Sequence, residues 1–284
     1  MQQSDPDTVR ARQRAQWSAA APGWLADRDE VAGPTRAVTD ALLAGARIAE
    51  GNAVLDVACG GGDPALTIAR VVGPAGRVVG LDLTPAMVEG ARAAARGAGL
   101  PNAEFRAIDD ECIPGVADAS FDAVTSRFGL MFMANPVAAA DAWRKALRPG
   151  GRIAVSTWEA FAPISFVLAI IGRHVELPPT DPDAPGILAL RTPEKLGAVL
   201  RDAGYAEITV ARVRTPVFES AEPERWWDVM TRSAGPLVLL FASLPESKQA
   251  AIRADGIGAL RERHPSGIVE EFGDALIGSA TNPG

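Results

Sequence analysis

Residues 53–65 read AVLDVACGGGDPA, and this stretch decides the fold. Its first half is a short apolar run, typical of a parallel strand that is buried on both faces. The successive glycines Gly60 to Gly62 then permit a tight turn and let a ligand approach the backbone. Asp63 and Pro64 follow as the expected N-cap and first residue of a helix. The stretch therefore predicts strand, turn and helix, with free backbone N–H groups at the turn for a polar ligand.

The alternation of strand and helix continues beyond this stretch. Strands are expected at 53–57, 77–82, 103–108, 121–127 and 152–158, and the helices between them begin at 64, 84 and 135. Such an alternation predicts an α/β fold with a parallel, doubly wound sheet and right-handed crossovers. Ligands of such sheets bind beyond the carboxyl ends of the strands, near the point where the strand order reverses.

The N-terminal residues 1–44 are expected to form a helical arm outside this pattern. One helix is predicted from Asp7 or Thr8 to about Ala20, ended by Pro22 and Gly23, and a second over residues 35–48. Trp17 and Trp24 flank the predicted break. Either they pack the arm onto the core, or the arm closes as a lid over the glycine turn.

Two later segments also interrupt the alternation. Residues 160–190 combine an apolar run with a proline-rich passage, and residues 214–268 are expected to be mostly helical. We interpret both as caps over the carboxyl edge of the sheet. The chain is then one domain whose core covers about 45–160, 192–213 and 273–281.

Composition narrows the function class. The chain has 284 residues, 48% hydrophobic and 22% charged, and a net charge of -7, so it has no general attraction for nucleic acid or anionic membranes. Two cysteines argue against a disulfide framework or a thiolate zinc site, and no metal site is expected. The start of the chain lacks an apolar signal region, and the run from Ile164 to Ile171 is too short to span a bilayer. We expect a cytoplasmic protein without membrane insertion.

Polar residues stand where the expected strands end, namely Asp82, Asp109, Asp110, Ser126 and Arg127. Asp82 lies 20 residues beyond Gly62. Nucleotide-binding sheets place at this interval a carboxylate that accepts hydrogen bonds from ribose hydroxyls. The spacing therefore predicts a ribose-binding role for Asp82.

Two cofactor classes compete for the glycine turn. Gly60, Gly62 and Ala65 satisfy the G-x-G-x-x-A pattern of dinucleotide-binding proteins, so an oxidoreductase using NAD(P) is an alternative. A dinucleotide places its pyrophosphate at the helix N-terminus, where Asp63 would add a like charge. S-adenosylmethionine has no phosphate and carries a sulfonium cation, so the electrostatics favour it.

Five segments between residues 53 and 158 form a combined signature: VLDVACGGG, VVGLDLTPAMV, FRAIDDE, FDAVTSRFGLMFMANP and LRPGGRIAVSTW. In this order they resemble the class I S-adenosylmethionine-dependent methyltransferases, and among them the UbiE-like group of ubiquinone and menaquinone biosynthesis. The resemblance implies a Rossmann-like, mostly parallel seven-stranded sheet whose final strand, ALIGSAT, runs antiparallel beside AEITVARV. The family usually has glycine where this chain has Ala58, a small change.

The resemblance also implies the cofactor site. S-adenosyl-L-methionine would be bound and S-adenosyl-L-homocysteine released. Its expected contacts are Asp56, Ala58, Gly60 and Gly62 at the methionine end, Asp82 at the ribose, Leu83 and Met87 beside the adenine, Asp109 and the Asp110 backbone at the adenine edge, and Ser126 on the fourth strand.

The methyl acceptor is expected in the cap. We predict a mostly hydrophobic pocket for a small apolar or aromatic metabolite, formed by Trp17, Trp24, Arg127, Phe128, Met131 and Trp158. The alternative is that the aromatic residues are only core and that Arg127 makes a structural ion pair. Two further alternatives stay open: a cofactor-binding protein without catalysis, and a homodimer formed through the apolar cap.

No catalytic side chain is assigned from the sequence. Methyl transfer from a sulfonium depends chiefly on alignment of the acceptor, so no dedicated acid or base is compulsory. His174 and His264 lie in no recognisable constellation and are interpreted as surface or packing residues. Cys59 is interpreted as a small buried residue instead of a nucleophile.

Overall fold

A seven-stranded sheet organises the molecule, in the order β3-β2-β1-β4-β5-β7-β6. The computed structural model describes residues 5–28, 30, 33–177, 181 and 184–284. The strands are β1 (Ala53–Val57), β2 (Arg77–Asp82), β3 (Ala103–Ala107), β4 (Phe121–Arg127), β5 (Leu147–Phe161), β6 (Ala206–Ser220) and β7 (Val269–Thr281).

The first five strands are parallel, and β7 runs antiparallel between β5 and β6. This confirms the Rossmann-like fold and the antiparallel last strand. The chain leaves β1 in one direction towards β2 and β3, and the sheet continues on the other side of β1 with β4. The carboxyl ends of β1 and β4 therefore flank the point where the strand order reverses, the usual place for a ligand.

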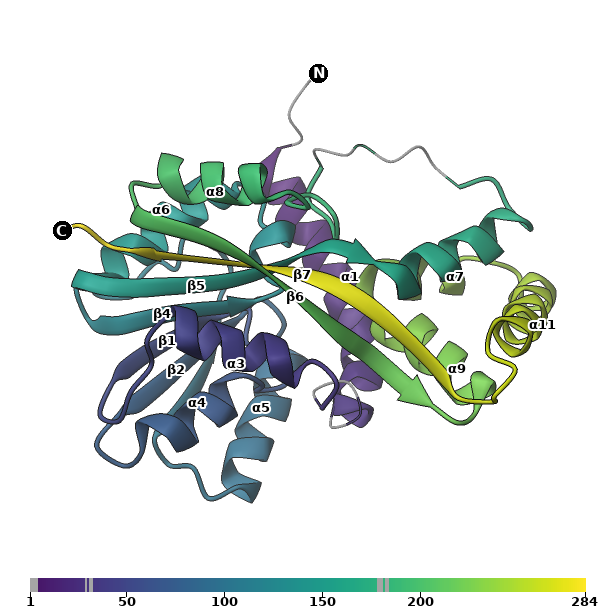
Figure 1. Cartoon of the computed structure of the whole chain (residues 1–284), viewed down its shortest axis with the longest axis horizontal. Coiled ribbons are helices and arrows are strands. Elements are labelled where there is room, and N and C mark those ends of the chain that lie inside the picture. Colours follow the sequence, from purple (N-terminus) through teal and green to yellow (C-terminus); the bar gives the residue numbers. More distant parts are fainter. Residues whose placement is uncertain (1–4, 29, 31–32, 178–180, 182–183) are drawn as a thin grey trace.

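Helices cover both faces of the sheet (Figure 1). On one face lie α3 (Arg36–Gly45), α4 (Ala65–Val72) and α5 (Pro85–Gly97), and on the other α6 (Pro136–Ala146) and α8 (Pro193–Asp202). All five residues of β1 are buried as a result, although β1 contains Asp56. The side chains of Asn135 and Thr192 accept backbone N–H hydrogen bonds at the starts of α6 and α8 and so cap these helices.

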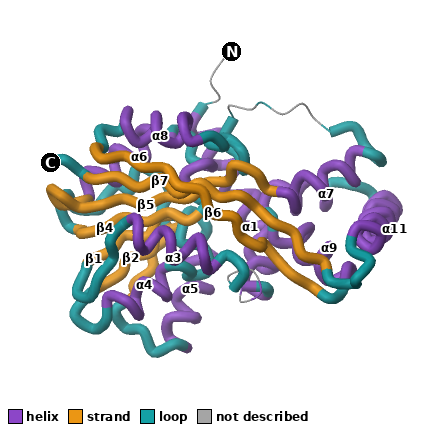
Figure 2. The backbone as a smooth tube through the Cα atoms, viewed as in Figure 1, coloured by secondary structure: helices purple, strands orange, loops and turns teal. Residues whose placement is uncertain are grey.

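A helical lobe extends from the far ends of β6 and β7 (Figures 1 and 2). It contains α7 (Ala162–Gly172), α9 (Pro223–Ser233), α10 (Gly235–Ala242) and α11 (Glu246–Arg263). Trp226 and Trp227 are fully buried there, and both make edge contacts with Phe166. β6 continues to Ser220, beyond the end expected from the sequence, and so connects the sheet to this lobe.

The N-terminal helix α1 (Pro6–Ala26) passes through Pro22 without a break, so the predicted end before Pro22 is wrong. Tertiary packing outweighs the cost of an interior proline. A Cβ atom on Gly23 would lie 2.5 Å from the Arg232 carbonyl oxygen, and one on Gly235 would lie 3.2 Å from the Trp17 ring. These close approaches hold α1 against α9 and α10.

Asp27, directly after α1, fixes this helix to the lobe. Its side chain is 1% exposed and accepts hydrogen bonds from Arg232 (Nε to Oδ2, 2.8 Å), Arg225 (2.8 Å) and the Ser233 hydroxyl (3.3 Å). Burial alone would raise the pKa of this carboxyl, but the two guanidinium groups outweigh it and hold the pKa below its usual value. Asp27 is therefore a charged anchor within the fold.

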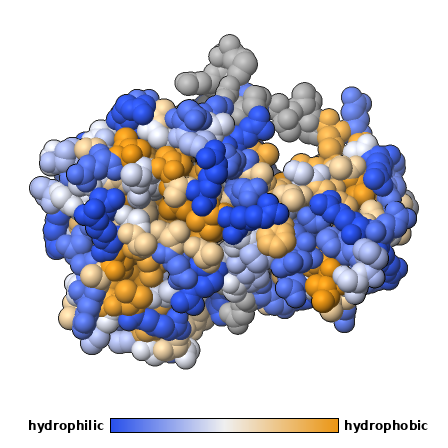
Figure 3. Space-filling view, viewed as in Figure 1, coloured by the Kyte–Doolittle hydropathy of each residue, from blue (hydrophilic) through white to orange (hydrophobic). Residues whose placement is uncertain are grey.

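The surface mixes polar and apolar side chains. Figure 3 shows hydrophilic residues interspersed with smaller hydrophobic patches on the face viewed in Figure 1. Among the helices described, none combines the length and apolar character needed to cross a membrane.

Candidate functional site

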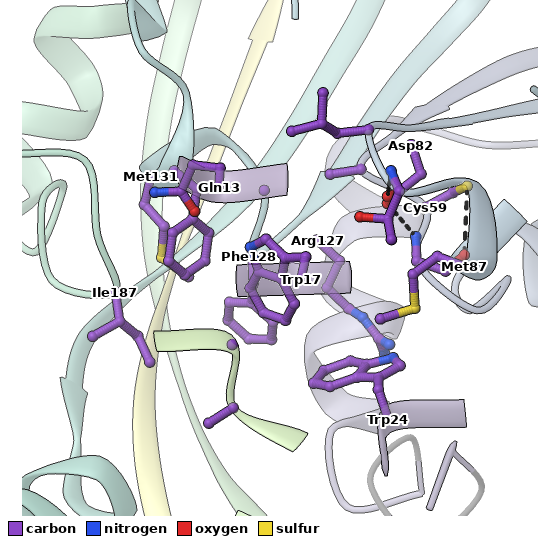
Figure 4. Close-up of a pocket in the computed structure, with 18 of the residues that line it drawn as sticks. Gln13, Trp17, Trp24, Cys59, Asp82, Met87, Arg127, Phe128, Met131 and Ile187 are labelled. Carbon is purple, nitrogen blue, oxygen red and sulfur yellow. Dashed lines mark hydrogen bonds between the residues drawn. The ribbon is translucent and has the colours of Figure 1, made fainter. Parts of the chain in front are cut away.

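A cavity of about 220 Å³ lies beyond the carboxyl ends of the strands. Its walls come from α1, the turn after β1, the ends of β2, β4 and β5, the short helix η1 (Leu130–Phe132), β6, and the α9–α10 junction. Figure 4 shows α1 crossing the opening, with Gln13 beside Met131 at one end and Trp24 at the other. Segments distant in sequence thus enclose one space.

Asp82 ends β2 at the cavity wall. Its two carboxylate oxygens each accept one backbone hydrogen bond at 2.8 Å, from Gly60 and from Thr84. Burial raises the pKa of Asp82, while these two N–H groups oppose the rise. A carboxylate has about four lone-pair sites, so Asp82 keeps capacity for two hydroxyl donors. Leu83 and Met87 line the cavity directly beyond it.

Asp56 and Ser126 lie beneath the cavity floor and do not line it. Asp56 is fully buried; one of its oxygens accepts a 2.6 Å hydrogen bond from Thr125, and the other has no partner. Burial raises the pKa of Asp56 to about 7, against the opposing effects of Thr125 and Arg127. The Ser126 hydroxyl is also buried without a partner.

The glycine turn has the backbone that its sequence predicts. Gly60 and Gly62 have φ values of 52° and 110°, in the region that favours glycine. Ala58 lies there too, with φ of 60°, so the family's usual glycine is replaced at a position where alanine is strained. Ala58 and Gly60 line the cavity, whereas Gly62 is buried against α5.

Arg127 forms a structural ion pair with Asp63. The charged atoms are 2.6 Å apart, and Arg127 also donates to Thr39 and to the Asp63 carbonyl. Asp63 is therefore not the helix N-cap predicted, since α4 begins at Ala65 after Pro64. The pair also neutralises Asp63, so the electrostatic argument against a dinucleotide loses its force.

Asp109 and Asp110 lie outside the cavity lining. The Asp109 side chain is 93% exposed and pairs with Arg14 at 2.6 Å. Asp110 is 38% exposed and accepts a hydrogen bond from the Cys112 backbone. Neither side chain is among the residues that line the cavity, and the contact of Asp109 and of the Asp110 backbone with the adenine edge stays a prediction.

A polar group that the sequence analysis missed stands beside them. Arg10, Gln13 and Glu111 line the cavity, and Arg10 lies 3.2 Å from Glu111. Glu111 also accepts hydrogen bonds from the backbone of Ala134 and Asn135. The sequence contains a partial indication of this group, because residues 10, 13 and 17 are spaced to share one face of a helix.

Aromatic side chains form the opposite wall. Phe128 and Trp158 stack with ring centroids 4.1 Å apart and an interplanar angle of 9°, and Phe161 packs on Trp158 at 4.7 Å. Trp17 contacts Trp24 and Phe132 edge-on. Phe128 has φ of 58°, a strained value of the kind that clusters at functional sites. The predicted pocket residues Trp17, Trp24, Arg127, Phe128, Met131 and Trp158 all line the cavity.

Neither histidine lines the cavity. His174 lies 3.0 Å from Asp255, and His264 lies 3.1 Å from Glu271, both in the helical lobe or its base. Cys59 does line it, but burial raises the pKa of its thiol well above the usual value. Among the residues that the structure describes, the cavity thus holds no histidine or thiolate to act as a base.

Known proteins resemble this chain in sequence, and one family model matches its central part. Residues 48–179, which span β1 to β5, match the family model described as a methyltransferase domain. An uncharacterised protein of Mycobacterium tuberculosis is 28% identical over 256 residues, 88% of this chain and 87% of that protein. The ubiquinone/menaquinone biosynthesis C-methyltransferase UbiE of Pseudomonas putida is 40% identical over 114 residues, 40% of this chain and 43% of that protein.

The fold recurs in solved structures. A putative methyltransferase of Haloferax volcanii, in complex with the Trm112 methyltransferase activator, superposes with a TM-score of 0.56 at 21% identity. The superposition covers 95% of this chain and 97% of that chain, so the likeness of fold includes the flanking helices as well as the sheet.

Proposed function

This chain is an S-adenosylmethionine-dependent methyltransferase, and we propose that it methylates a small, uncharged, apolar or aromatic metabolite. The observation that carries the proposal is the composition of the cavity wall opposite the cofactor residues. The described residues that β5, β6, α9 and α10 contribute to it carry no charge: Trp158, Phe161, Val217, Phe218, Met230 and their neighbours.

The cofactor fits the other half of the cavity. Asp82 keeps acceptor capacity for ribose hydroxyls, and the turn at Gly60 brings bare backbone to the cavity. The buried, unpartnered oxygen of Asp56 below that turn leaves an acceptor for a cationic group or a bridging water. We propose that the methionine end lies over Gly60 and the ribose at Asp82, with Leu83 and Met87 beside the adenine.

When bound, the cofactor supplies an electrophilic methyl group that a correctly aligned acceptor takes by in-line displacement. The stacked Phe128 and Trp158 present a flat surface against which an aromatic acceptor can be oriented. A charged acceptor would lose its hydration here without gaining a partner. This wall therefore selects for neutral acceptors and positions them.

Alignment is the catalytic contribution that this proposal assigns to the protein. Arg127 and Asp63 are committed to each other, and Asp82 lies at the cofactor end. The acceptor atom is then expected to be nucleophilic without help from a side chain, as an uncharged aromatic amine or an activated ring carbon is. The membership of the UbiE-like group and the homodimer stay proposals for this chain.

Turnover with a panel of phenols, quinols and amines tests the proposal. We expect S-adenosylhomocysteine to form with neutral aromatic acceptors and not with their carboxylated analogues. Trp158→Ala should raise the acceptor KM at least tenfold while cofactor affinity holds. Phe272→Ala, which removes an aromatic ring outside the cavity lining, is the matched control. Cofactor binding without turnover of any acceptor would favour a non-catalytic cofactor-binding protein.

A further inference from the structure

Gln13 is a buried polar side chain whose amide oxygen the fold leaves without a hydrogen-bond partner. It is 5% exposed, it lines the cavity, and its Oε1 atom makes no hydrogen bond. A buried amide oxygen without a partner destabilises the folded state, so its retention in a cavity wall indicates a bound donor.

The position of Gln13 follows from two ion pairs on either side of it. Arg10 pairs with Glu111, and Arg14 pairs with Asp109. Gln13 therefore lies over the chain segment that leaves the sheet after β3. That segment begins beside the ribose site, because the Ile108 backbone donates a hydrogen bond of 2.9 Å to the Asp82 carbonyl.

A nucleoside held at Asp82 has one direction in which to extend its base. The glycine turn after β1 occupies one side of Asp82, and the polar segment after β3 occupies the other. With the methionine end at the turn, the adenine extends towards Ile108, and its 6-amino group is a donor that needs an acceptor there. Asp109 is directed outward to Arg14, and Glu111 is paired with Arg10 and accepts from two backbone groups through its Oε1 atom. On α1, the acceptor that lines the cavity without a hydrogen bond is the Gln13 Oε1 atom.

We propose that the Gln13 Oε1 atom accepts a hydrogen bond from the adenine 6-amino group, so that the N-terminal helix contributes to recognition of the cofactor base. The inference rests on the cofactor position proposed above. It leaves Asp109 outside the cofactor site, in a solvent-exposed pair with Arg14. Trp17 and Trp24, on the same helix, then cover the cofactor only when α1 is in place.

Calorimetric binding of two nucleosides tests this assignment without any methyl acceptor. The probes are S-adenosylhomocysteine and its purine analogue with hydrogen at position 6. Wild-type enzyme should bind the adenine form about tenfold more tightly, the usual value of one hydrogen bond to a buried acceptor. Gln13→Leu should abolish this discrimination, and Gln13→Glu, which keeps an acceptor, should restore part of it. Asp109→Asn, the matched control, should leave the discrimination intact.

The outcomes separate this inference from the cofactor position. Discrimination that survives in Gln13→Leu, or that disappears in Asp109→Asn, would overturn the assignment of Gln13. An equal loss of affinity for both nucleosides in Gln13→Leu would also overturn it, since that is the result of a merely structural role. The ribose position is tested independently by Asp82→Asn, which should weaken both nucleosides alike.

Discussion

The anchor at Asp27 decides whether α1 is a fixed wall of the active site. In Asp27→Ala, Arg225, Arg232 and Ser233 lose their shared acceptor. Removing one partner of a buried ion pair costs about 3–5 kcal/mol. The side chains of Arg232 and Arg225 are 42% and 32% exposed and can rehydrate, so the lower end applies. We expect a loss of about 3 kcal/mol, a fall in Tm of roughly 6–10 °C.

Urea unfolding at pH 7 measures this loss, with Asp228→Ala as the control. Asp228, on the same helix α9, pairs with Arg253 of α11, but both side chains are about two-fifths exposed, so its removal should cost less than about 1 kcal/mol. Equal losses in the two variants would refute the anchoring role. The folded-state pKa of Asp27 is lowered, so its contribution is present above the ordinary pKa of about 3.9. The difference between wild type and Asp27→Asn should therefore shrink as the pH falls below about 4.

Three further changes test the site. Gly129→Ala should destabilise the fold by about 1–3 kcal/mol, because its Cβ would lie 2.5 Å from the Ser126 hydroxyl oxygen; Gly258→Ala, in an open position on α11, should be neutral or stabilising, and the two unfolding curves give the comparison. Asp56→Asn should flatten the pH dependence of the free energy of unfolding. Burial raises the pKa of Asp56 to about 7, so the stability that the protonated carboxyl contributes is lost as pH rises from about 4 through 7. Unfolding of both proteins at pH 5 and pH 8 measures this loss, and the same pH dependence in wild type and variant would contradict it. Asp82→Asn should lower S-adenosylhomocysteine affinity at least tenfold by calorimetry, since an amide nitrogen cannot accept hydrogen bonds; unaltered affinity would place the ribose elsewhere.

The sequence was informative where local chemistry and topology agree. Buried apolar strands, the glycine turn and Asp82 at a strand end all follow from short-range patterns. Those patterns correctly predict the parallel sheet and the edge at which the cavity opens. The antiparallel β7 came from the resemblance, not from the residues alone.

The errors arose where distant residues meet. Pro22 ends a helix by local rules, but packing on α9 and α10 keeps α1 continuous. Asp63 was interpreted as a free charge because its partner, Arg127, is 64 residues away. Asp109 likewise follows a strand as expected, yet Arg14 holds it outside the cavity.

Gln13 was missed for a related reason. A glutamine in a polar N-terminal helix does not by itself predict that its side chain is buried with an amide oxygen lacking a hydrogen bond. The spacing of Arg10, Gln13 and Trp17 does predict one helix face, but not what that face covers. The acceptor-binding wall could not be predicted from local sequence either, because its residues come from β5, β6 and the helical lobe.

A crystal structure of the enzyme with S-adenosylhomocysteine tests the central claim most directly. We predict ribose hydroxyls within hydrogen-bond distance of the Asp82 carboxylate, and the sulfur atom directed towards the wall formed by Phe128 and Trp158. A nucleoside bound away from Asp82, or a sulfur atom shielded from that aromatic wall, would contradict the account.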